Sequence, residues 1–222
     1  MCVMSRDGSA DAGRTVTAIV LAAGAGSRFR DVGHKLTATL PPTASRPAEP
    51  VARRAIAAAV AAAVGPVVVV TGRLAHSDLD LDLDLDPNQD PGDDMIETAH
   101  NPDWASGQMS SVRVGLDVAE RNGSTVAIVG LADQPGIEPS AWRAVADAAT
   151  VGPTPITVAT YDGRRGNPVA LHRSVWDLLP TGGDEGARSL MRLHPELVGE
   201  VPCSGSPTDI DTTEDLRRWQ NN

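Results

Sequence analysis

Short apolar runs alternate with helix-forming stretches along most of the chain. The runs at residues 16–21, 67–70 and 126–131 consist largely of valine, isoleucine, leucine and alanine, which is typical of strands buried on both faces. Segments at 51–65, rich in alanine, and at 142–149 follow such runs and predict helices. The alternation predicts an α/β fold with helices on both faces of a mostly parallel sheet, a three-layer αβα arrangement.

The remaining segments predict shorter elements. We expect strands at 95–100, at 156–161 and, after a turn at Asp162-Gly163, at 168–172. Helices are expected from a cap at Ser110 or Ser111 to about Glu120, at 187–193 and at 213–220. Thr212 is expected to cap the last of these, with Asp215 three residues later. The prolines at 41–50 predict a linker.

Length and composition fit one soluble domain. The chain has 222 residues, and we expect a flexible segment at 1–14 followed by a single domain at 15–222. Residues 1–14 lack the apolar core of a signal peptide and no run approaches about 18 apolar residues, so a cytoplasmic location without a membrane span is expected. Cys2 and Cys203 are too few for a disulfide framework.

The acidity of the chain is local. The net charge is −10, and residues 78–94 alone hold eight Asp and no Lys or Arg. The repeat DLDLDLDLD at 78–86 has no calcium-loop geometry, so we interpret residues at about 77–94 as a surface insertion without chemistry. The rest of the chain has no basic stripe interleaved with aromatic residues, which disfavours nucleic-acid binding.

A glycine loop follows the first apolar run. Residues 22–26 read Ala-Ala-Gly-Ala-Gly, and glycine lets successive backbone N–H groups approach phosphate oxygens closely. Arg28 and Lys35 add positive charge just beyond the loop. The stretch therefore predicts a triphosphate cradle, although an ordinary strand-to-helix turn with two glycines remains open at this point.

Two other phosphate-binding motifs fit this loop poorly. A dinucleotide fingerprint requires a third glycine where the chain has Phe29. A P-loop requires Ser or Thr after the lysine, where the chain has Leu36.

Two acidic positions are candidate metal ligands. Asp133 follows the apolar run at 126–131, at the sheet edge where the glycine loop is expected, and a carboxylate there can hold Mg²⁺ against phosphates. Asp209 and Asp211 flank Ile210 and share a face if that segment is extended. Each carboxylate can equally be explained by a turn or by a helix N-terminus. The histidines show no zinc spacing, and no G-x-S-x-G nucleophile motif occurs.

Six motifs in order resemble the molybdopterin nucleotidyltransferase family, and within it the molybdenum cofactor cytidylyltransferases. Spread over residues 15–220, they are LAAGAGSRF with GHKL, NPDWASGQMSS, LADQP, GRRGNPVA, DEGAR and DIDTTEDL. The resemblance implies a Rossmann-like nucleotidyltransferase fold and Mg²⁺-dependent transfer of CMP from CTP to the terminal phosphate of molybdopterin, releasing pyrophosphate. Ala22-Ala23, where guanylyltransferases more often have a glycine, resembles the cytidylyl branch.

The resemblance also implies roles for single residues. Arg28, Lys35 and Asp133 would be catalytic, and Asp133 and Asp211 would bind the metal. Gly107 and Ser110 would lie near the base and ribose. The nucleotide would contact Leu21, Ala22, Ala23, Gly24, Ala25, Gly26, Ser27, Arg28, Lys35, Gly107 and Ser110, and the pterin-type acceptor would contact Gly166, Asn167, Pro168, Gly186 and Arg188. A recipient molybdoenzyme or its chaperone would be a transient partner.

The chain departs from the family pattern at Phe29-Arg30-Asp31 and in the tract at 78–86. Two alternatives within the same class are a guanylyltransferase and an NTP transferase that acts on another phosphorylated small molecule. An alternative from another class is a nucleotide-dependent oxidoreductase on the same scaffold. It would keep the glycine loop for a dinucleotide but would give Asp133 and Asp211 no role.

Overall fold

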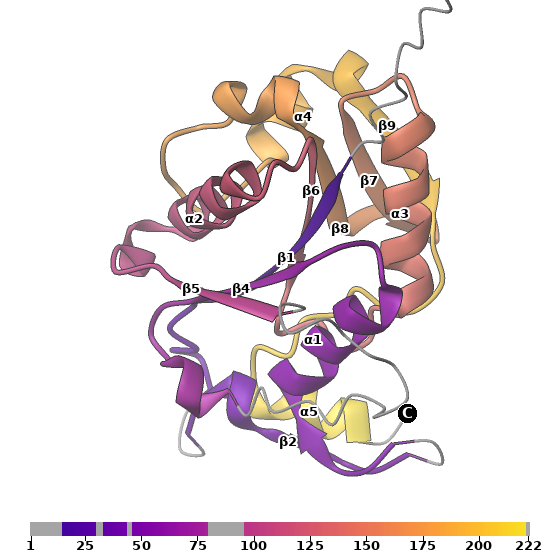
Figure 1. The fold of residues 1–222 in the computed structure, drawn as a ribbon. Coiled ribbons are helices and arrows are strands. Elements are labelled where there is room, and N and C mark those ends of the chain that lie inside the picture. The colour runs from indigo at the N-terminus through magenta and orange to yellow at the C-terminus, as the bar shows by residue number, and fades with distance from the viewer. Residues whose placement is uncertain (1–14, 30–32, 44–45, 80–95, 221–222) are drawn as a thin grey trace, which may run out of the picture.

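The computed structural model describes residues 15–29, 33–43, 46–79 and 96–220, and its centre is a seven-stranded sheet (Figure 1). The strand order is β5-β4-β1-β6-β8-β7-β9. The strands are β1 (Val16–Ala22), β4 (Val67–Thr71), β5 (Ile96–His100), β6 (Val126–Leu131), β7 (Ile156–Tyr161), β8 (Arg164–His172) and β9 (Val198–Pro202). Only β8 runs antiparallel to its neighbours β6 and β7, so the expected mostly parallel sheet is confirmed.

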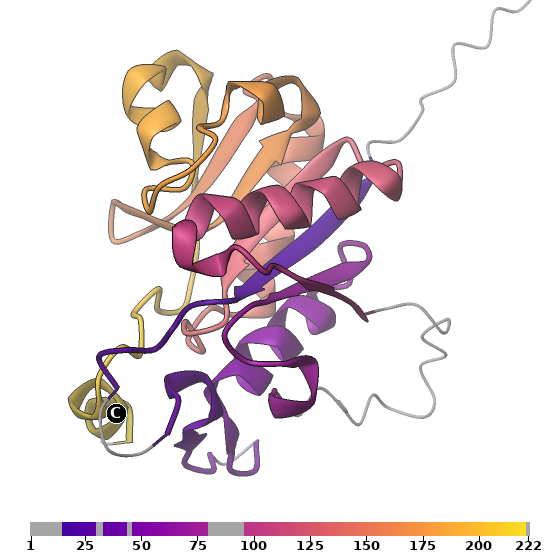
Figure 2. The same cartoon turned by 90° about the vertical axis from the view of Figure 1, so that its left-hand side faces the viewer.

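Helices cover both faces of the sheet. Helices α1 (Val51–Ala62) and α3 (Pro139–Val151) pack on the face that holds Ala18 and Val20 of β1. Helices α2 (Gln108–Arg121) and α4 (Arg188–Leu193) pack on the opposite face, which holds Ile19 and Leu21 (Figures 1 and 2). Because side chains alternate along a strand, β1 supplies both cores and is buried throughout.

Several expected boundaries differ from the structure. The last two residues of the segment expected to be a linker form β3 (Glu49–Pro50), which pairs antiparallel with β2 (Thr39–Leu40), just before that segment. Strand β8 begins at Arg164 and not at 168, and β9 was not expected, because its five residues include a glycine and a proline and lack an apolar run. The expected cap of α5 (Thr213–Gln220) is confirmed, since Asp215 N–H donates to Thr212 Oγ1 at 3.1 Å and Thr212 N–H to Asp215 Oδ2 at 2.9 Å.

The start of α2 also corrects the sequence prediction. The helix begins at Gln108 after Gly107, so neither Ser110 nor Ser111 is its cap. The N–H groups of its first turn find acceptors in a distant loop: Gln108 N–H donates to Asp184 Oδ1 at 3.3 Å, and Met109 N–H donates to the Gly183 carbonyl at 3.0 Å. A tertiary contact therefore takes the place of a local serine cap.

The side chains of His34 and Phe29 help to fix the glycine loop. Gly26 has φ of +61°, and a Cβ there would lie 2.9 Å from His34 Nε2. His34 Nε2 lies 3.0 Å from the Gly24 carbonyl, and its Nδ1 accepts a bond from Leu36 N–H at 3.2 Å, so the neutral imidazole donates through Nε2. Phe29 is buried with Leu40 and Ile210, which explains an aromatic residue where a dinucleotide fingerprint has glycine.

The Asp-Leu repeat is only partly described. Leu79, its first leucine, is 1% exposed and belongs to the core beneath α1 and α3, so the expected surface insertion does not include it. Residues 80–94 lie outside the described residues. Within the described ranges, no helix is both long and apolar enough to cross a membrane.

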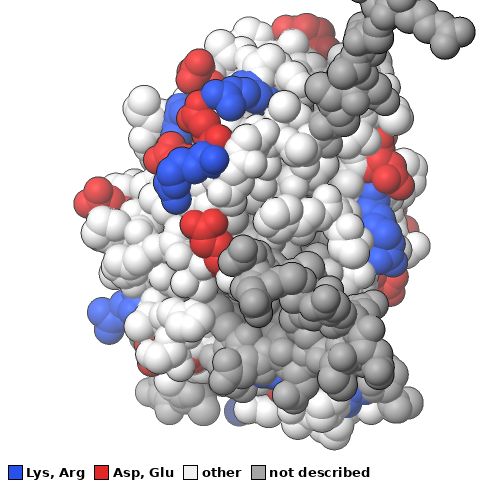
Figure 3. Space-filling view, in the orientation of Figure 1, with Lys and Arg blue, Asp and Glu red and all other residues white. Residues whose placement is uncertain are grey.

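Charged side chains on the face shown in Figure 3 are mixed in sign. On this face the described basic residues therefore form no continuous stripe.

Leu79→Ala tests whether this leucine is part of the core. We expect the free energy of unfolding to fall by about 2–4 kcal/mol, because the substitution removes buried methyl groups and leaves a cavity. The control Leu193→Ala, at a side chain that is 71% exposed, should change it by less than about 0.5 kcal/mol. Urea unfolding of the three proteins measures the difference, and equal values would place Leu79 outside the core.

His34→Gln tests the pH dependence of the loop. Burial lowers the pKa of His34, and the charges of Lys35 and Arg73 lower it further, against the opposing bond to Gly24. Because the pKa of His34 is lower in the folded state than in the unfolded state, neutral His34 contributes to the free energy of unfolding above the unfolded pKa. This contribution is lost as the pH falls through the folded pKa. Gln can keep both hydrogen bonds without titrating. The loss of unfolding free energy between about pH 7.5 and about pH 5.5 should therefore be smaller in the variant than in wild type.

Candidate active site

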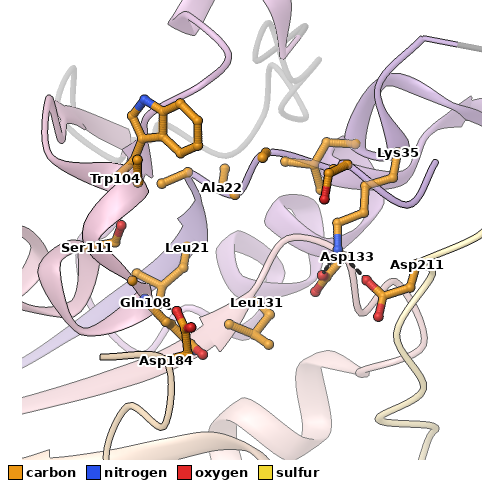
Figure 4. Close-up of a pocket in the computed structure, with 18 of the residues that line it drawn as sticks. Leu21, Ala22, Lys35, Trp104, Gln108, Ser111, Leu131, Asp133, Asp184 and Asp211 are labelled. Carbon is orange, nitrogen blue, oxygen red and sulfur yellow. Dashed lines mark hydrogen bonds and ion pairs between the residues drawn. The ribbon is translucent and has the colours of Figure 1, made fainter. Parts of the chain in front are cut away.

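A cavity of about 410 Å³ opens at the carboxyl ends of β1 and β6, where ligands gather in parallel sheets (Figure 4). Its wall combines the glycine loop, the start of α2 and three acidic residues. The lining residues are Leu21, Ala22, Ala23, Gly24, Ala25, Gly26, Ser27, Arg28, Lys35, Leu36, Trp104, Ala105, Gly107, Gln108, Ser111, Leu131, Asp133, Asp184 and Asp211. Every nucleotide-binding or metal residue expected from the sequence, except Ser110, lines this one cavity.

Lys35 lies between two carboxylates at one end of the cavity. Its Nζ is 2.6 Å from Asp133 Oδ2, just after β6, and 2.6 Å from Asp211 Oδ1, just before α5 (Figure 4). Burial disfavours the charged ammonium, but the charge of Asp133 and the hydrogen bonds to both carboxylates outweigh burial and raise the pKa of Lys35. The side chain is therefore a fixed positive charge at neutral pH.

Asp133 has one oxygen without a partner. Its Oδ2 binds Lys35, whereas its Oδ1 is buried and accepts no hydrogen bond from the described residues. A buried carboxylate oxygen left unpaired is costly, and a cation can satisfy it. No cluster of three or more His, Cys, Asp or Glu that could hold a metal ion occurs among the described residues.

Arg28, which lines the cavity, and Asp209, which does not, are the next charged residues around this cluster. Arg28, an exposed side chain, lies 2.9 Å from Asp211 Oδ2. Asp209 instead accepts a hydrogen bond from Gln134 Nε2 at 2.7 Å. Burial and the nearby charge of Asp133 raise the pKa of Asp209, against the lowering effect of Gln134. Of the two aspartates that flank Ile210, Asp211 is therefore the one that joins Lys35 and Asp133.

Ser110 and Ser111 have different surroundings. Ser110 is absent from the cavity lining, and its hydroxyl lies 2.8 Å from the Gly107 carbonyl and 3.1 Å from that of Asp103. Ser111 lines the cavity in its place, as do Trp104 and Gln108, and sequence reasoning selected none of these three. All three lie inside the NPDWASGQMSS motif, so the motif itself was the available signal. Asp184 of the DEGAR motif, expected from the resemblance to face the acceptor, lines this first cavity.

A second cavity of about 430 Å³ lies beside the first, and Gln108 lines both. Its wall includes Gly166, Asn167, Gly186 and Arg188, four of the five residues expected at the acceptor site, whereas Pro168 is not among its lining residues. Five of its aliphatic side chains come from β6, β7, β8 and α2: Val112, Val129, Val158, Val169 and Leu171. The residues expected to bind the two substrates thus line neighbouring cavities.

A hydrogen-bond chain joins the second cavity to the acidic cluster. Asn167 Nδ2 donates to Gln134 Oε1 at 2.9 Å, and Gln134 Nε2 donates to Asp209 Oδ1 at 2.7 Å. Gln134 is 5% exposed, so this chain runs through the interior of the protein.

Comparison with known proteins finds similar sequences and similar solved structures. The chain is 32% identical over 136 residues to the nicotine blue oxidoreductase of Paenarthrobacter nicotinovorans, a match covering 53% of this chain and 61% of that protein. The chain thus spans about three-fifths of the length of this curated relative. The crystal structure of Rv0371c from Mycobacterium tuberculosis H37Rv superposes with a TM-score of 0.71 at 25% identity and covers 95% of this chain and 99% of that one. The manganese complex of Rv0371c gives a TM-score of 0.68 at 25% identity, over 94% and 99% of the two chains.

A family model supplies the classification. The model that describes the MobA-like NTP transferase domain matches residues 18–198, from β1 to the start of β9. The match includes the glycine loop, Lys35, Asp133 and the residues of the second cavity, and it confirms the resemblance derived from the sequence motifs. The chain therefore belongs to the family of MobA-like NTP transferase domains.

Proposed function

We propose that the chain transfers CMP from CTP to the phosphate of a molybdopterin-type acceptor, with a divalent cation and release of pyrophosphate. Membership of the NTP transferase family supports nucleotidyl transfer as the reaction. The observation that carries the proposal is Lys35 bridging Asp133 and Asp211 beside the glycine loop. The direct test is pyrophosphate release from each of the four NTPs with molybdopterin, in which we expect CTP to be the best donor.

In this reaction the protein would form no covalent bond with either substrate. An acceptor phosphate oxygen attacks the α-phosphorus of the nucleotide while the bond to pyrophosphate breaks, so no protein nucleophile is needed. The N–H groups of residues 22–26, Arg28 and the protonated Lys35 would hold the triphosphate and oppose its negative charge. The absence of a serine or histidine nucleophile motif from the sequence agrees with this chemistry.

The residues present fit a hard divalent cation. Mg²⁺ in phosphate-transferring sites takes one or two carboxylates and completes its shell with phosphate and water oxygens. Asp133, with its unpaired Oδ1, and Asp211 would supply those carboxylates. Bound Mg²⁺ would neutralise charge on the phosphates. The manganese complex of Rv0371c supports a divalent cation in a relative of this fold.

The second cavity supports a ring-bearing phosphorylated acceptor. Its aliphatic wall can accommodate a ring system, and Arg188, exposed at its rim, has no ion-pair partner in the described part of the chain. Gln108 at the boundary would lie between acceptor and nucleotide. The family resemblance further supports a cytoplasmic location and transient contact with a recipient molybdoenzyme or its chaperone.

A second candidate, a nucleotide-dependent oxidoreductase on the same scaffold, is favoured by the similarity to nicotine blue oxidoreductase. It assigns no role to the pair of carboxylates around Lys35. Absorbance of the purified protein and NADH oxidation test it, since a bound flavin would be yellow. A flavin spectrum with NADH turnover, but without pyrophosphate release from any NTP, would favour this candidate.

Nucleotide preference is the first prediction. We expect CTP to bind more tightly than GTP in the presence of Mg²⁺, because Ala22-Ala23 is the cytidylyl-type sequence of the loop. The variant Ala23→Gly should bind GTP more tightly relative to CTP than wild type does. Thermal unfolding of the variant shows whether the substitution also lowers its stability. Calorimetric titrations measure both constants. Tighter GTP binding by wild type would support a guanylyltransferase and leave the family unchanged.

The carboxylate pair generates a second prediction. Asp133→Asn and Asp211→Asn should each reduce kcat by roughly 10²- to 10³-fold, as expected when electrostatic stabilisation of the transition state is lost. Because both would serve one ion, the double variant should be little worse than the worse single variant. The matched variant Asp209→Asn, at a carboxylate that Gln134 engages, should lose less than about 10-fold.

Pyrophosphate release at saturating CTP measures these effects, and thermal unfolding confirms that each variant is folded. Penalties that multiply in the double variant would show two independent roles. Full activity of Asp211→Asn would instead move the second metal ligand to Asp209 or to water.

A further inference from the structure

Asn167 lies where strand β8 leaves its regular pairing. The register with β7 stops at Gly166 and resumes at Val169, so the two residues between them form a bulge. A bulge turns a side chain away from the direction that a regular strand would give it. From this bulge the Asn167 side chain contributes to the wall of the second cavity and also reaches Gln134, in the loop after β6.

Two contacts hold the bulge close to that loop. The Tyr161 hydroxyl donates to the Asn167 backbone carbonyl at 2.8 Å and so anchors the backbone of the bulge. Gly166 is closely packed, since a Cβ there would lie 3.0 Å from Pro207 Cβ and 3.2 Å from the Tyr161 ring. The absence of a side chain at Gly166 therefore lets the hairpin approach the segment at Pro207, and this brings Asn167 within reach of Gln134.

The orientation of the Gln134 amide is fixed from the side opposite Asn167. Gln134 Nε2 donates to the Pro207 carbonyl at 2.9 Å and to Asp209 Oδ1 at 2.7 Å, so both of its hydrogens are used. A backbone carbonyl can only accept, so the amide nitrogen must face Pro207 and Oε1 must face away from it. Oε1 accepts from Asn167 Nδ2 at 2.9 Å. These bonds form a relay that runs from Pro207 through Gln134 to Asn167.

The relay leaves one defined polar atom on the Asn167 side chain. If the Asn167 amide turned over, its Oδ1 would face Gln134 Oε1, and two acceptors would meet without a hydrogen between them. Asn167 is therefore held with Nδ2 toward Gln134. Its Oδ1 accepts no hydrogen bond from the described residues, so this oxygen remains as an acceptor for an occupant of the second cavity.

We propose that Gln134 is a positioning residue for the second cavity, which acts by holding Asn167 Oδ1 ready to accept a hydrogen bond from the occupant. Gln134 itself lines neither cavity, so it would act without touching a ligand. The group that meets Oδ1 has to be an N–H or O–H donor and cannot be an ionised phosphate. A pterin ring carries such donors in its amino group and ring N–H. The role rests on the proposed function, because it requires an acceptor substrate in this cavity.

The test compares the two substrates on wild type, Gln134→Met, Asn167→Ala and the double variant. Methionine is close to glutamine in size but lacks the amide. Calorimetry with molybdopterin, and separately with CTP in Mg²⁺, gives the dissociation constants. Each single variant should weaken molybdopterin binding about 3- to 30-fold and change CTP binding less than about 2-fold. Because Gln134 acts through Asn167, the double variant should bind molybdopterin no more weakly than Asn167→Ala alone.

A spectroscopic signal reports the hydrogen bond itself. The side-chain N–H signals of Asn167 in an NMR spectrum, identified by their loss in Asn167→Ala, should move in Gln134→Met. Ser124→Ala is the matched control, because it removes another buried hydrogen bond, 2.7 Å long, to Thr17, and Ser124 lines neither cavity. This control should change neither the two dissociation constants nor the Asn167 signals.

The outcomes separate the relay from the proposed function. If Gln134→Met binds molybdopterin like wild type, or weakens it further in the Asn167→Ala background, Gln134 does not act through Asn167 and the proposal is overturned. Equal weakening of molybdopterin and CTP in Gln134→Met would overturn it as well, because it would show a general loss of structure. If wild type binds no molybdopterin, the proposed acceptor is wrong. The Asn167 signals then decide on the relay, and signals that do not move in Gln134→Met overturn it.

Discussion

The contact on which the site depends is the ammonium of Lys35 held between the carboxylates of Asp133 and Asp211. Its three members come from segments far apart in the chain: the turn after the glycine loop, the end of β6 and the segment before α5. The electrostatic attraction among them therefore fixes the relative positions of three segments around one cavity. The two carboxylates would repel each other without the lysine between them, so the cluster needs a cation to persist.

The fold brings these segments together through its parallel strands. Strands β1 and β6 are neighbours in the sheet and end at the same edge, which places the glycine loop beside Asp133. Phe29 and Ile210 are buried in one small cluster, so packing also draws the Asp211 segment toward the loop. Hydrophobic contacts thus place the charged groups, and the charged groups set the chemistry of the cavity.

The interior strands and the acidic cluster were predictable because their signals are local in the sequence. Strands β1, β4 and β6 are buried on both faces and so have continuous apolar sequences. Asp133 was predictable because it directly follows such a run. The short pair β2 and β3 and the edge strand β9 lack that signal, since their pairing partners decide their conformation.

The choice between Ser110 and Ser111 shows a different limit. Adjacent residues of a helix point about 100° apart, so the helix start and its docking decide which serine lines the cavity. Bonds from Gln108 and Met109 to the loop at 183–184 fix that start, and no feature near the serines reveals them.

The antiparallel direction of β8 determines which of its residues line the second cavity. Because β8 runs opposite to its neighbours, its first residues, and not its last, lie at the edge where β1 and β6 end. Arg165, Gly166 and Asn167 therefore enter the second cavity from a hairpin that contributes nothing to the glycine loop. Substitutions of Arg165 or Gly166 can change the wall of the second cavity without replacing any residue that lines the first. The wall of the second cavity can therefore change in sequence while the glycine loop stays the same.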